Sequence, residues 1–275
     1  MKKNLIIIFT LMMIFSSCNL PEKKSSEKDH KTTELKQDAT SNDYLIMATL
    51  WFQKSAECRA LSYQAFNWAT KMLDLHLLNL QDTLPPCVVL DIDETVLDNS
   101  PFEGKCIKTG KSYSPEFWKE WSDLAQAKAI AGALDFCKYA QSKGVEVFYV
   151  SNRKINELEA SIKNLAILGF PFADKEHFFL RSAESSKKAR RELIAKNQNI
   201  LLLIGDNLND FDEIFESRQN DYGFSIVDDQ REEFGNRFIL LPNPMYGSWE
   251  KPILNSSGNN KISKHEKRVE QIKSY

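Results

Sequence analysis

The sequence lacks an excess of either charge. It contains 36 lysine and arginine residues against 38 aspartate and glutamate residues, which leaves a formal net charge of −2 at pH 7. A protein that binds a nucleic-acid polymer usually carries a basic surface, so this balance gives no reason to expect such a partner. With 275 residues, of which 42% are hydrophobic, the chain has the size of one sizeable domain with additions.

A hydrophobic run long enough to cross a membrane is also lacking at the N-terminus. The apolar run from Leu5 to Phe15 is shorter than the ~20 residues that a bilayer-spanning helix needs. Two lysines precede this run and two serines follow it, so residues 1–17 have the organisation of a secretory signal peptide.

The small residues before Cys18 resemble the lipobox of bacterial lipoproteins, in which the cysteine is lipidated and becomes the mature N-terminus. Phe15 departs from the leucine that is usual at its position. An ordinary cleaved signal or an uncleaved anchor stays open. Residues 18–43 are rich in charged and hydroxyl side chains, so we expect a lipid anchor followed by a flexible tether. The expected location is outside the inner membrane, lipid-anchored in the outer membrane of a Gram-negative bacterium.

Cysteine is scarce, and no two cysteines have the close spacing of a zinc site. Beyond Cys18 the chain has Cys58, Cys87, Cys106 and Cys137. An even number permits disulfides in an oxidising compartment. We favour the simpler interpretation of small buried side chains, because two of the four lie within apolar runs.

The pattern after residue 43 predicts an α/β fold. Apolar residues recur at helical spacing over about 44–80, as one long or two consecutive helices, until Pro85 and Pro86 end them. Short apolar runs then alternate with helical stretches. We expect strands at 87–93, 145–150, 178–180 and 200–204, and helices at about 131–143, 155–168, 185–196 and after 209. Unbroken apolar strands are buried on both faces, which predicts a doubly wound, Rossmann-like parallel sheet.

About 35 residues separate the first strand from the next predicted helix, whereas a loop of this kind usually has ~2–6. We therefore expect an inserted helical cap at about 99–130, which carries Trp118. The main domain would span 44–255, and residues 256–275 would form a polar, loosely held tail.

Acidic side chains follow two of the predicted strands. Asp91 and Asp93 end the first strand, and Asp206 and Asp210 follow the strand at 200–204. Alternation along a strand puts Asp91 and Asp93 on one face, at the sheet edge where doubly wound folds bind ligands. Carboxylates gathered there repel each other unless a cation neutralises them. An oxygen-rich cluster without His or Cys suits Mg²⁺.

Two further stations complete the pattern: Ser151 with Asn152 after the second strand, and Lys187 near the start of a helix. Any single acid here also fits a helix N-cap or a solvated loop. The four stations in this order resemble the motifs of the haloacid-dehalogenase-like hydrolases.

More narrowly, residues 44–249 resemble the class C acid phosphatases, a family of bacterial lipoprotein phosphatases and 5′-nucleotidases. The resemblance rests on the segments 51–61, 90–99, 150–153, 205–211, 241–243 and 246–249. Asn209 departs from the acid pair often found there, so only Asp206 and Asp210 carry over. Lys187 and Lys188 compete for the lysine role, and the spacing to Arg190 favours Lys187.

The resemblance implies a mechanism. Asp91 attacks phosphorus and forms an aspartyl-phosphate, and Asp93 acts first as acid and then as base. Mg²⁺ would bind the carboxylates of Asp91 and Asp206 and the backbone carbonyl of Asp93, with Asp210 ordering a metal-bound water. The phosphate-binding residues would be Ser151, Asn152 and Lys187.

Trp118 and Tyr246 correspond to family positions that sandwich a nucleobase, although plain packing also accounts for them. We therefore expect a Mg²⁺-dependent acid phosphatase acting on nucleoside 5′-monophosphates, with nicotinamide mononucleotide as a further candidate. Two rivals stay open: a surface lipoprotein that binds a cation or cofactor without turnover, and a phosphotransferase on the same scaffold. The membrane is an expected partner through the lipid, and a homodimer is kept open.

Overall fold

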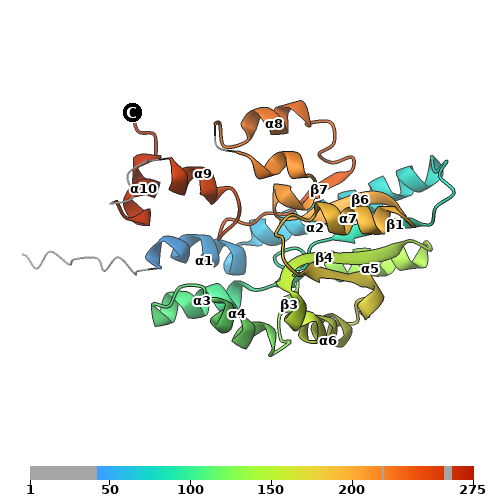
Figure 1. The fold of residues 1–275 in the computed structure, drawn as a ribbon, viewed down its shortest axis with the longest axis horizontal. Coiled ribbons are helices and arrows are strands. Elements are labelled where there is room, and N and C mark those ends of the chain that lie inside the picture. Colours follow the sequence, from blue (N-terminus) through green and yellow to red (C-terminus); the bar gives the residue numbers. More distant parts are fainter. Residues whose placement is uncertain (1–41, 219, 257–261) are drawn as a thin grey trace, which may run out of the picture. The chain divides into compact units, whose positions relative to one another are not determined.

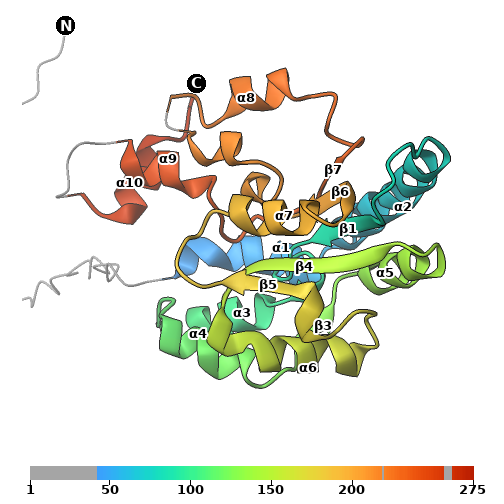
Figure 2. The same cartoon turned by 45° about the vertical axis from the view of Figure 1, so that its right-hand side comes forward.

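Five parallel strands form the central sheet of the computed structural model, which describes residues 42–218, 220–256 and 262–275. Their order is β5-β4-β1-β6-β7 (Figures 1 and 2), so the first strand lies in the middle. The bounds are β1 Pro86–Leu90, β4 Glu146–Lys154, β5 Phe178–Arg181, β6 Asn199–Gly205 and β7 Phe238–Leu240. The predicted α/β fold is confirmed. Three details differ: β1 ends at Leu90 rather than at residue 93, β4 continues to Lys154 rather than ending at residue 150, and the three-residue β7 was not predicted. Ser151 and Asn152 therefore lie within the last part of β4 rather than after it.

Both faces of the sheet are buried. Along β1, Val88 and Leu90 pack in one hydrophobic cluster, and Cys87 and Val89 pack in another. The first cluster includes side chains from α2 (Ala56–Leu78), α5 (Ala133–Ser142) and α6 (Leu158–Leu168). The second includes Ile194 of α7 (Lys188–Ala195). This two-sided burial explains the unbroken apolar runs of the strands.

Two consecutive helices precede the sheet. A short 3₁₀ turn, η1 (Asp43–Leu45), leads into α1 (Ile46–Lys54), and α2 follows after one residue. That residue, Ser55, caps α2: its Oγ accepts a hydrogen bond from the backbone N–H of Cys58 at 3.0 Å. Such a cap satisfies one of the unpaired N–H groups at the start of a helix, so the chain breaks here rather than forming one long helix.

The segment expected to form a cap contains two helices on a small ribbon. Strands β2 (Leu97–Asp98) and β3 (Lys128–Ala129) pair antiparallel, and α3 (Ser100–Thr109) and α4 (Pro115–Ser122) lie between them in the chain. Figures 1 and 2 show the two helices together at the edge of the sheet. The ribbon fixes where the insertion leaves and rejoins the main domain.

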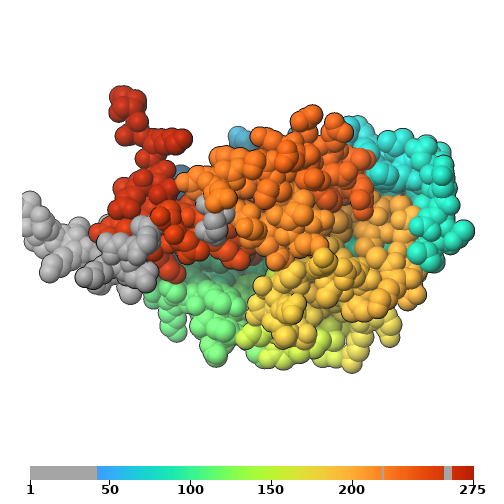
Figure 3. Space-filling view, turned by 45° about the horizontal axis from the view of Figure 1, so that its top comes forward, coloured from blue at the N-terminus to red at the C-terminus, as the bar shows by residue number. Residues whose placement is uncertain are grey.

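The end of the chain differs from the expectation in two places. The predicted helix after residue 209 is a pair of 3₁₀ turns, η4 (Leu208–Asp210) and η5 (Glu213–Glu216), each begun by a capping side chain. The tail after residue 255 contains a helix, α10 (Lys264–Glu270), which packs on α9 (Glu250–Asn255) through an ion pair between Arg268 and Glu250 at 2.6 Å. The helix α8 (Phe224–Asp229) lies before β7 in the chain. In Figure 3, the red C-terminal segment and the green cap border each other at the surface.

The predicted signal peptide, Cys18 and almost all of the tether lie outside the described residues. In the described part of the chain, no helix has the length and apolar character to cross a bilayer. Cys58, Cys87, Cys106 and Cys137 are all buried and free. The interpretation of these cysteines as small core side chains is therefore confirmed.

Candidate active site

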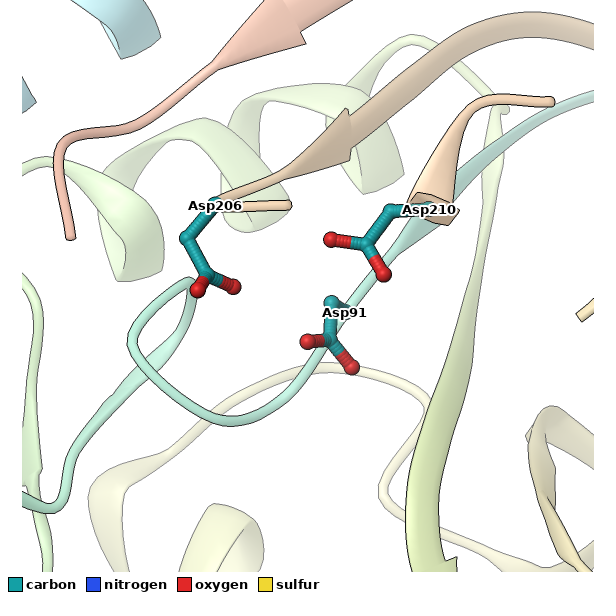
Figure 4. A group of neighbouring side chains, drawn as sticks. All are labelled: Asp91, Asp206 and Asp210. Atoms are coloured by element: carbon teal, nitrogen blue, oxygen red, sulfur yellow. The ribbon is translucent and has the colours of Figure 1, made fainter. Parts of the chain in front are cut away.

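Three carboxylates meet at the carboxyl end of the sheet. Asp91 directly follows β1, Asp206 directly follows β6, and Asp210 closes the turn η4. One oxygen of each lies within 4.8 Å of the others, and Figure 4 shows the three side chains pointing toward one another. The adjacency of β1 and β6 produces this convergence. The Asp91 N–H extends the pairing by donating to the Ile204 carbonyl at 2.9 Å.

The turn after β6 aims Asp210 back at the strand end. The Asp210 carboxylate accepts a hydrogen bond from the Asn207 N–H at 2.9 Å, and the Asn207 carbonyl accepts one from the Asp210 N–H at 2.8 Å. Gly205 makes room for this turn, because a Cβ there would collide with the Asp210 side chain. Glycine is therefore required at this position for close packing.

Asp206 is fixed by two side chains from other segments. Thr95 donates to one carboxylate oxygen at 3.2 Å, and Asn243 donates to the other at 2.9 Å. Burial, reinforced by Asp210, raises the pKa of Asp206 to about 7. The Asn243 hydrogen bond opposes this shift because it favours the charged form. Thr95 and Asn243 both stand in the recognised motifs, but neither was assigned a role from the sequence.

Lys187 supplies the positive charge of the cluster. Its Nζ lies 2.6 Å from Asp91 and 2.7 Å from Asp210, and its side chain is only 4% exposed. Lys188 instead pairs with Glu213 at the surface. The structure thus favours Lys187 over Lys188 at the site. Burial raises the pKa of Asp91 far above its usual range, and Lys187 opposes that shift.

The charges of this cluster leave room for a divalent cation. Three carboxylates against one ammonium give an excess of two negative charges when all are ionised. The donors are hard oxygens without His or Cys, the set that Mg²⁺ and related cations prefer. The residues present therefore fit a divalent metal.

Asp93 is held beside this cluster by a network of its own. One carboxylate oxygen accepts hydrogen bonds from Arg153 at 2.8 and 2.9 Å and from Asn99 at 2.8 Å. The other accepts from the Ser151 hydroxyl at 3.3 Å. The Arg153 side chain is 1% exposed, so this is a buried ion pair. Arg153 and Asn99 were not identified as site residues from the sequence, because nothing in their spacing distinguishes an orienting side chain from a loop residue.

The remaining predicted phosphate ligand, Asn152, has a different environment. Ser151 is fully buried, and its Oγ also accepts the Arg153 N–H at 3.1 Å. Asn152 is exposed at the cavity, and its Oδ1 accepts a hydrogen bond from Arg190 at 2.7 Å. Its amide nitrogen is thereby oriented by Arg190, which also donates to the Ser151 carbonyl.

A cavity of about 760 Å³ opens above these groups. Trp118 and Tyr246 both line it, together with Tyr44 and Tyr113. Trp118 also packs edge-on against Phe102, with ring centroids 5.1 Å apart. The structure therefore brings the two predicted stacking residues to the same cavity as Asp91 and Asp93, which is large enough for a small organic phosphate.

Comparisons with known protein families, solved structures and curated proteins agree with the resemblance found in the sequence. Residues 10–249 match the family described as "HAD superfamily, subfamily IIIB (Acid phosphatase)". A class C acid phosphatase from Bacillus anthracis is 43% identical, with 86% of this chain and 99% of that chain covered and a TM-score of 0.79. The same enzyme class from that organism with tungstate bound is 42% identical, with 85% and 98% covered and a TM-score of 0.79. A "Stem 31 kDa glycoprotein" of Glycine max is 25% identical over 200 residues, 70% of this chain and 69% of the plant protein.

Proposed function

The chain belongs to the acid phosphatases of HAD subfamily IIIB, and from that premise we propose a Mg²⁺-dependent enzyme that hydrolyses nucleoside 5′-monophosphates through an aspartyl-phosphate. Hydrolysis of a phosphomonoester follows from the family. The metal, the intermediate and the nucleotide are the proposal. The observation that carries it is the convergence of Asp91, Asp206 and Asp210 at the end of the sheet, with the buried Lys187 paired to Asp91 and Asp210.

In the first step, a carboxylate oxygen of Asp91 attacks phosphorus and the bond from phosphorus to the leaving oxygen breaks. Asp93 gives its proton to that leaving oxygen. Asp91 suits the role of nucleophile because it directly follows β1 and lines the cavity. Lys187 and Ser151 would hold phosphoryl oxygens, which stabilises the charge of the transition state.

In the second step, Asp93 takes a proton from water, the water oxygen bonds to phosphorus, and Asp91 leaves. The carboxyl of Asp93 must therefore stay in one place through both half-reactions. Arg153 and Asn99 hold one of its oxygens and leave the other to Ser151 and the cavity.

Mg²⁺ would be held by Asp91 and Asp206, with the backbone carbonyl of Asp93 and with Asp210 as an outer partner. When bound, the ion would neutralise the charge of the carboxylates and polarise a phosphoryl oxygen of the substrate. Tungstate, bound in one of the Bacillus anthracis structures, is a tetrahedral oxyanion like phosphate. A related site in this chain would therefore accept such an anion.

Metal dependence is tested by stripping the protein with chelator and measuring phosphate release from AMP. We expect near-zero turnover that returns when Mg²⁺ is added. The matched variant Asp91→Asn should stay inactive with Mg²⁺ present, at least about 10³-fold below the unaltered enzyme. Full activity of the stripped protein in excess chelator would contradict the metal assignment.

The location is a separate proposal, because its residues lie outside the described part of the chain. The order of charged, apolar and small residues before Cys18 supports export and lipidation. Cells fed labelled palmitate should incorporate it into the unaltered chain and not into Cys18→Ser. Fractionation of a Gram-negative host should place the labelled protein in the outer membrane, and label retained in Cys18→Ser would exclude this anchor.

A further inference from the structure

Two cations lie side by side in the cavity wall. Lys154 is the last residue of β4 and Arg181 is the last residue of β5, and the two are register partners. Both are half-buried and both line the cavity. Neighbouring strands lie ~4.8 Å apart, so paired residues bring their charges close together. Like charges placed directly opposite destabilise a sheet.

Neither cation is in ion-pair contact with a carboxylate among the described residues. The exposed Glu116 of the same cavity has its pKa lowered mainly by hydrogen bonds from its own backbone and from Ser114, with a further contribution from the charge of Lys154. Other cations of the same cavity are in ion-pair contact: Lys119 pairs with Asp123 at 2.6 Å, and Arg153 pairs with Asp93. Glu157, which also lines the cavity, has both oxygens occupied, one by the Ser122 hydroxyl at 2.8 Å and one by the Lys154 backbone N–H at 2.6 Å. The repulsion between the two cations is therefore not offset by an ion pair in this part of the protein.

The pair lies close to the expected phosphate position. Leu180 and Arg181 are consecutive in β5, and their partners in β4 are Ser151 and Lys154. Two extra residues of β4 therefore lie between these partners. This irregularity turns Arg153 inward to Asp93 and leaves Lys154 at the rim. Three residues of extended chain span at most about 10 Å, so Lys154 starts within that distance of Ser151.

The charge of Arg181 also acts across the cavity on the cap. Burial raises the pKa of Tyr113, Glu157 adds to the shift, and Arg181 opposes it. Tyr113 precedes α4 and borders the same cavity. Arg181 thus faces the space that a leaving group would occupy between the sheet and the cap.

We propose that Lys154 and Arg181 form an anion subsite that recognises a second anionic group, such as a second phosphoryl group, on the leaving-group side of the phosphomonoester. This inference rests on the proposed function. A planar guanidinium binds a phosphoryl group through two parallel hydrogen bonds, and an adjacent ammonium adds a point charge. An anion between the two side chains would also remove their mutual repulsion.

The test compares AMP with adenosine 3′,5′-bisphosphate, with chromatography identifying 3′-AMP as the product of the second. The unaltered enzyme should have a kcat/KM for the bisphosphate about tenfold above that for AMP, mainly through a lower KM, as a charged hydrogen bond would provide. Arg181→Met should remove this preference while changing AMP hydrolysis by less than about twofold. Lys154→Met should also reduce the preference for the bisphosphate. This variant provides the test if Arg181→Met does not fold.

Lys251→Met is the control. Lys251 lines the same cavity from α9, is exposed and is in no ion pair among the described residues, and it lies outside the β4–β5 pairing that sets Lys154 opposite Arg181. Lys251→Met should keep the preference for the bisphosphate.

A second matched pair of substrates, 3-phosphoglycerate and glycerol 3-phosphate, tests whether the subsite also recognises a carboxylate. A preference for 3-phosphoglycerate that Arg181→Met removes extends the subsite to carboxylates.

Direct binding separates this inference from the proposed function. Asp91→Asn, which cannot turn substrate over, is titrated with both nucleotides by calorimetry, alone and combined with Arg181→Met. Tighter binding of the bisphosphate that the second substitution abolishes supports the subsite even if no hydrolysis of AMP is found. Equal affinities for the two nucleotides, or an equal loss for both in Arg181→Met, would overturn it.

Discussion

Arg153 connects the acid–base residue to the cap. Two of its nitrogens bind Asp93, a third donates to Ser161 at 3.0 Å, and its guanidinium lies 5.7 Å from the centre of the Trp118 ring. Removal of one member of a buried ion pair leaves the other charge uncompensated and free to reorient. Arg153 is therefore a positioning residue for Asp93 rather than a catalytic residue.

The first prediction concerns this residue. Arg153→Met should lower kcat for AMP by about 10²-fold with a smaller change in KM, because a displaced acid–base group costs more in the reaction than in binding. Steady-state kinetics with Mg²⁺ measures the changes in kcat and KM separately. The control is Arg231→Met, which removes an exposed arginine and should change neither constant. An increase in KM at unchanged kcat would show that Arg153 binds substrate instead.

The second prediction concerns Asp206 in the metal-free protein. Its pKa of about 7 in the fold lies above the ordinary value of about 3.9. The folded state therefore holds a proton that the unfolded state releases, and this contribution to stability is present below pH 4 and is lost as the pH rises to about 7.

Thermal unfolding across this range measures the effect. The gain in Tm of Asp206→Asn over the unaltered protein, both without metal, should increase from pH 5 to pH 7.5. Mg²⁺ should raise the Tm of the unaltered protein at pH 7.5, since the ion binds the charged form. A Tm difference between Asp206→Asn and the unaltered protein that does not change with pH would contradict the raised pKa of Asp206.

At the scale of elements, the sequence indicated which strands carry the site, although not their exact ends. Asp91 and Asp206 directly follow apolar strands and Ser151 lies in the last part of another. Parallel strands share one carboxyl edge, so the convergence of these residues could be predicted. The short strand β7 could not, because three residues carry too little periodicity. The turns η4 and η5 were mistaken for a helix, because capping by Asn207 and Asp212 is a local competition that composition does not resolve.

The pairing of Lys154 with Arg181 was also out of reach of the sequence. It depends on the two extra residues in β4, and such irregularities leave no reliable pattern in a single chain. The same holds for Arg153, whose inward direction follows from that irregularity.

The third prediction concerns the cap. If Trp118 stacks on a base, Trp118→Ala should lower the ratio of kcat/KM for AMP to that for glycerol phosphate by about tenfold, since stacking is worth ~1–3 kcal/mol per base. Trp68→Ala is the matched control, because Trp68 is half-exposed on α2 and does not line this cavity. An unchanged ratio would favour a packing role against Phe102.

At the scale of the whole molecule, segments from across the chain build one cavity. Tyr44 comes from before α1, Trp118 from the cap, and Tyr246 from the segment between β7 and α9. Arg268 of α10 stacks on Tyr44, 3.8 Å from its ring centre, so α10 supports the part of the cavity wall that Tyr44 forms. The chain's polar end thus contributes to the site indirectly, by holding α9 and Tyr44 in place.

The account depends on Asp91 taking up the phosphoryl group. The direct measurement is peptide mass spectrometry of enzyme quenched in acid during turnover of p-nitrophenyl phosphate with Mg²⁺, using Asp93→Asn to slow hydrolysis of the intermediate. The p-nitrophenolate leaving group needs no proton from Asp93, so this substitution does not prevent the intermediate from forming. The account predicts the mass of one phosphoryl group on the peptide that contains Asp91, and its absence in the double variant with Asp91→Asn. A phosphoryl group on another residue, or AMP hydrolysis that persists in Asp91→Asn, would contradict it.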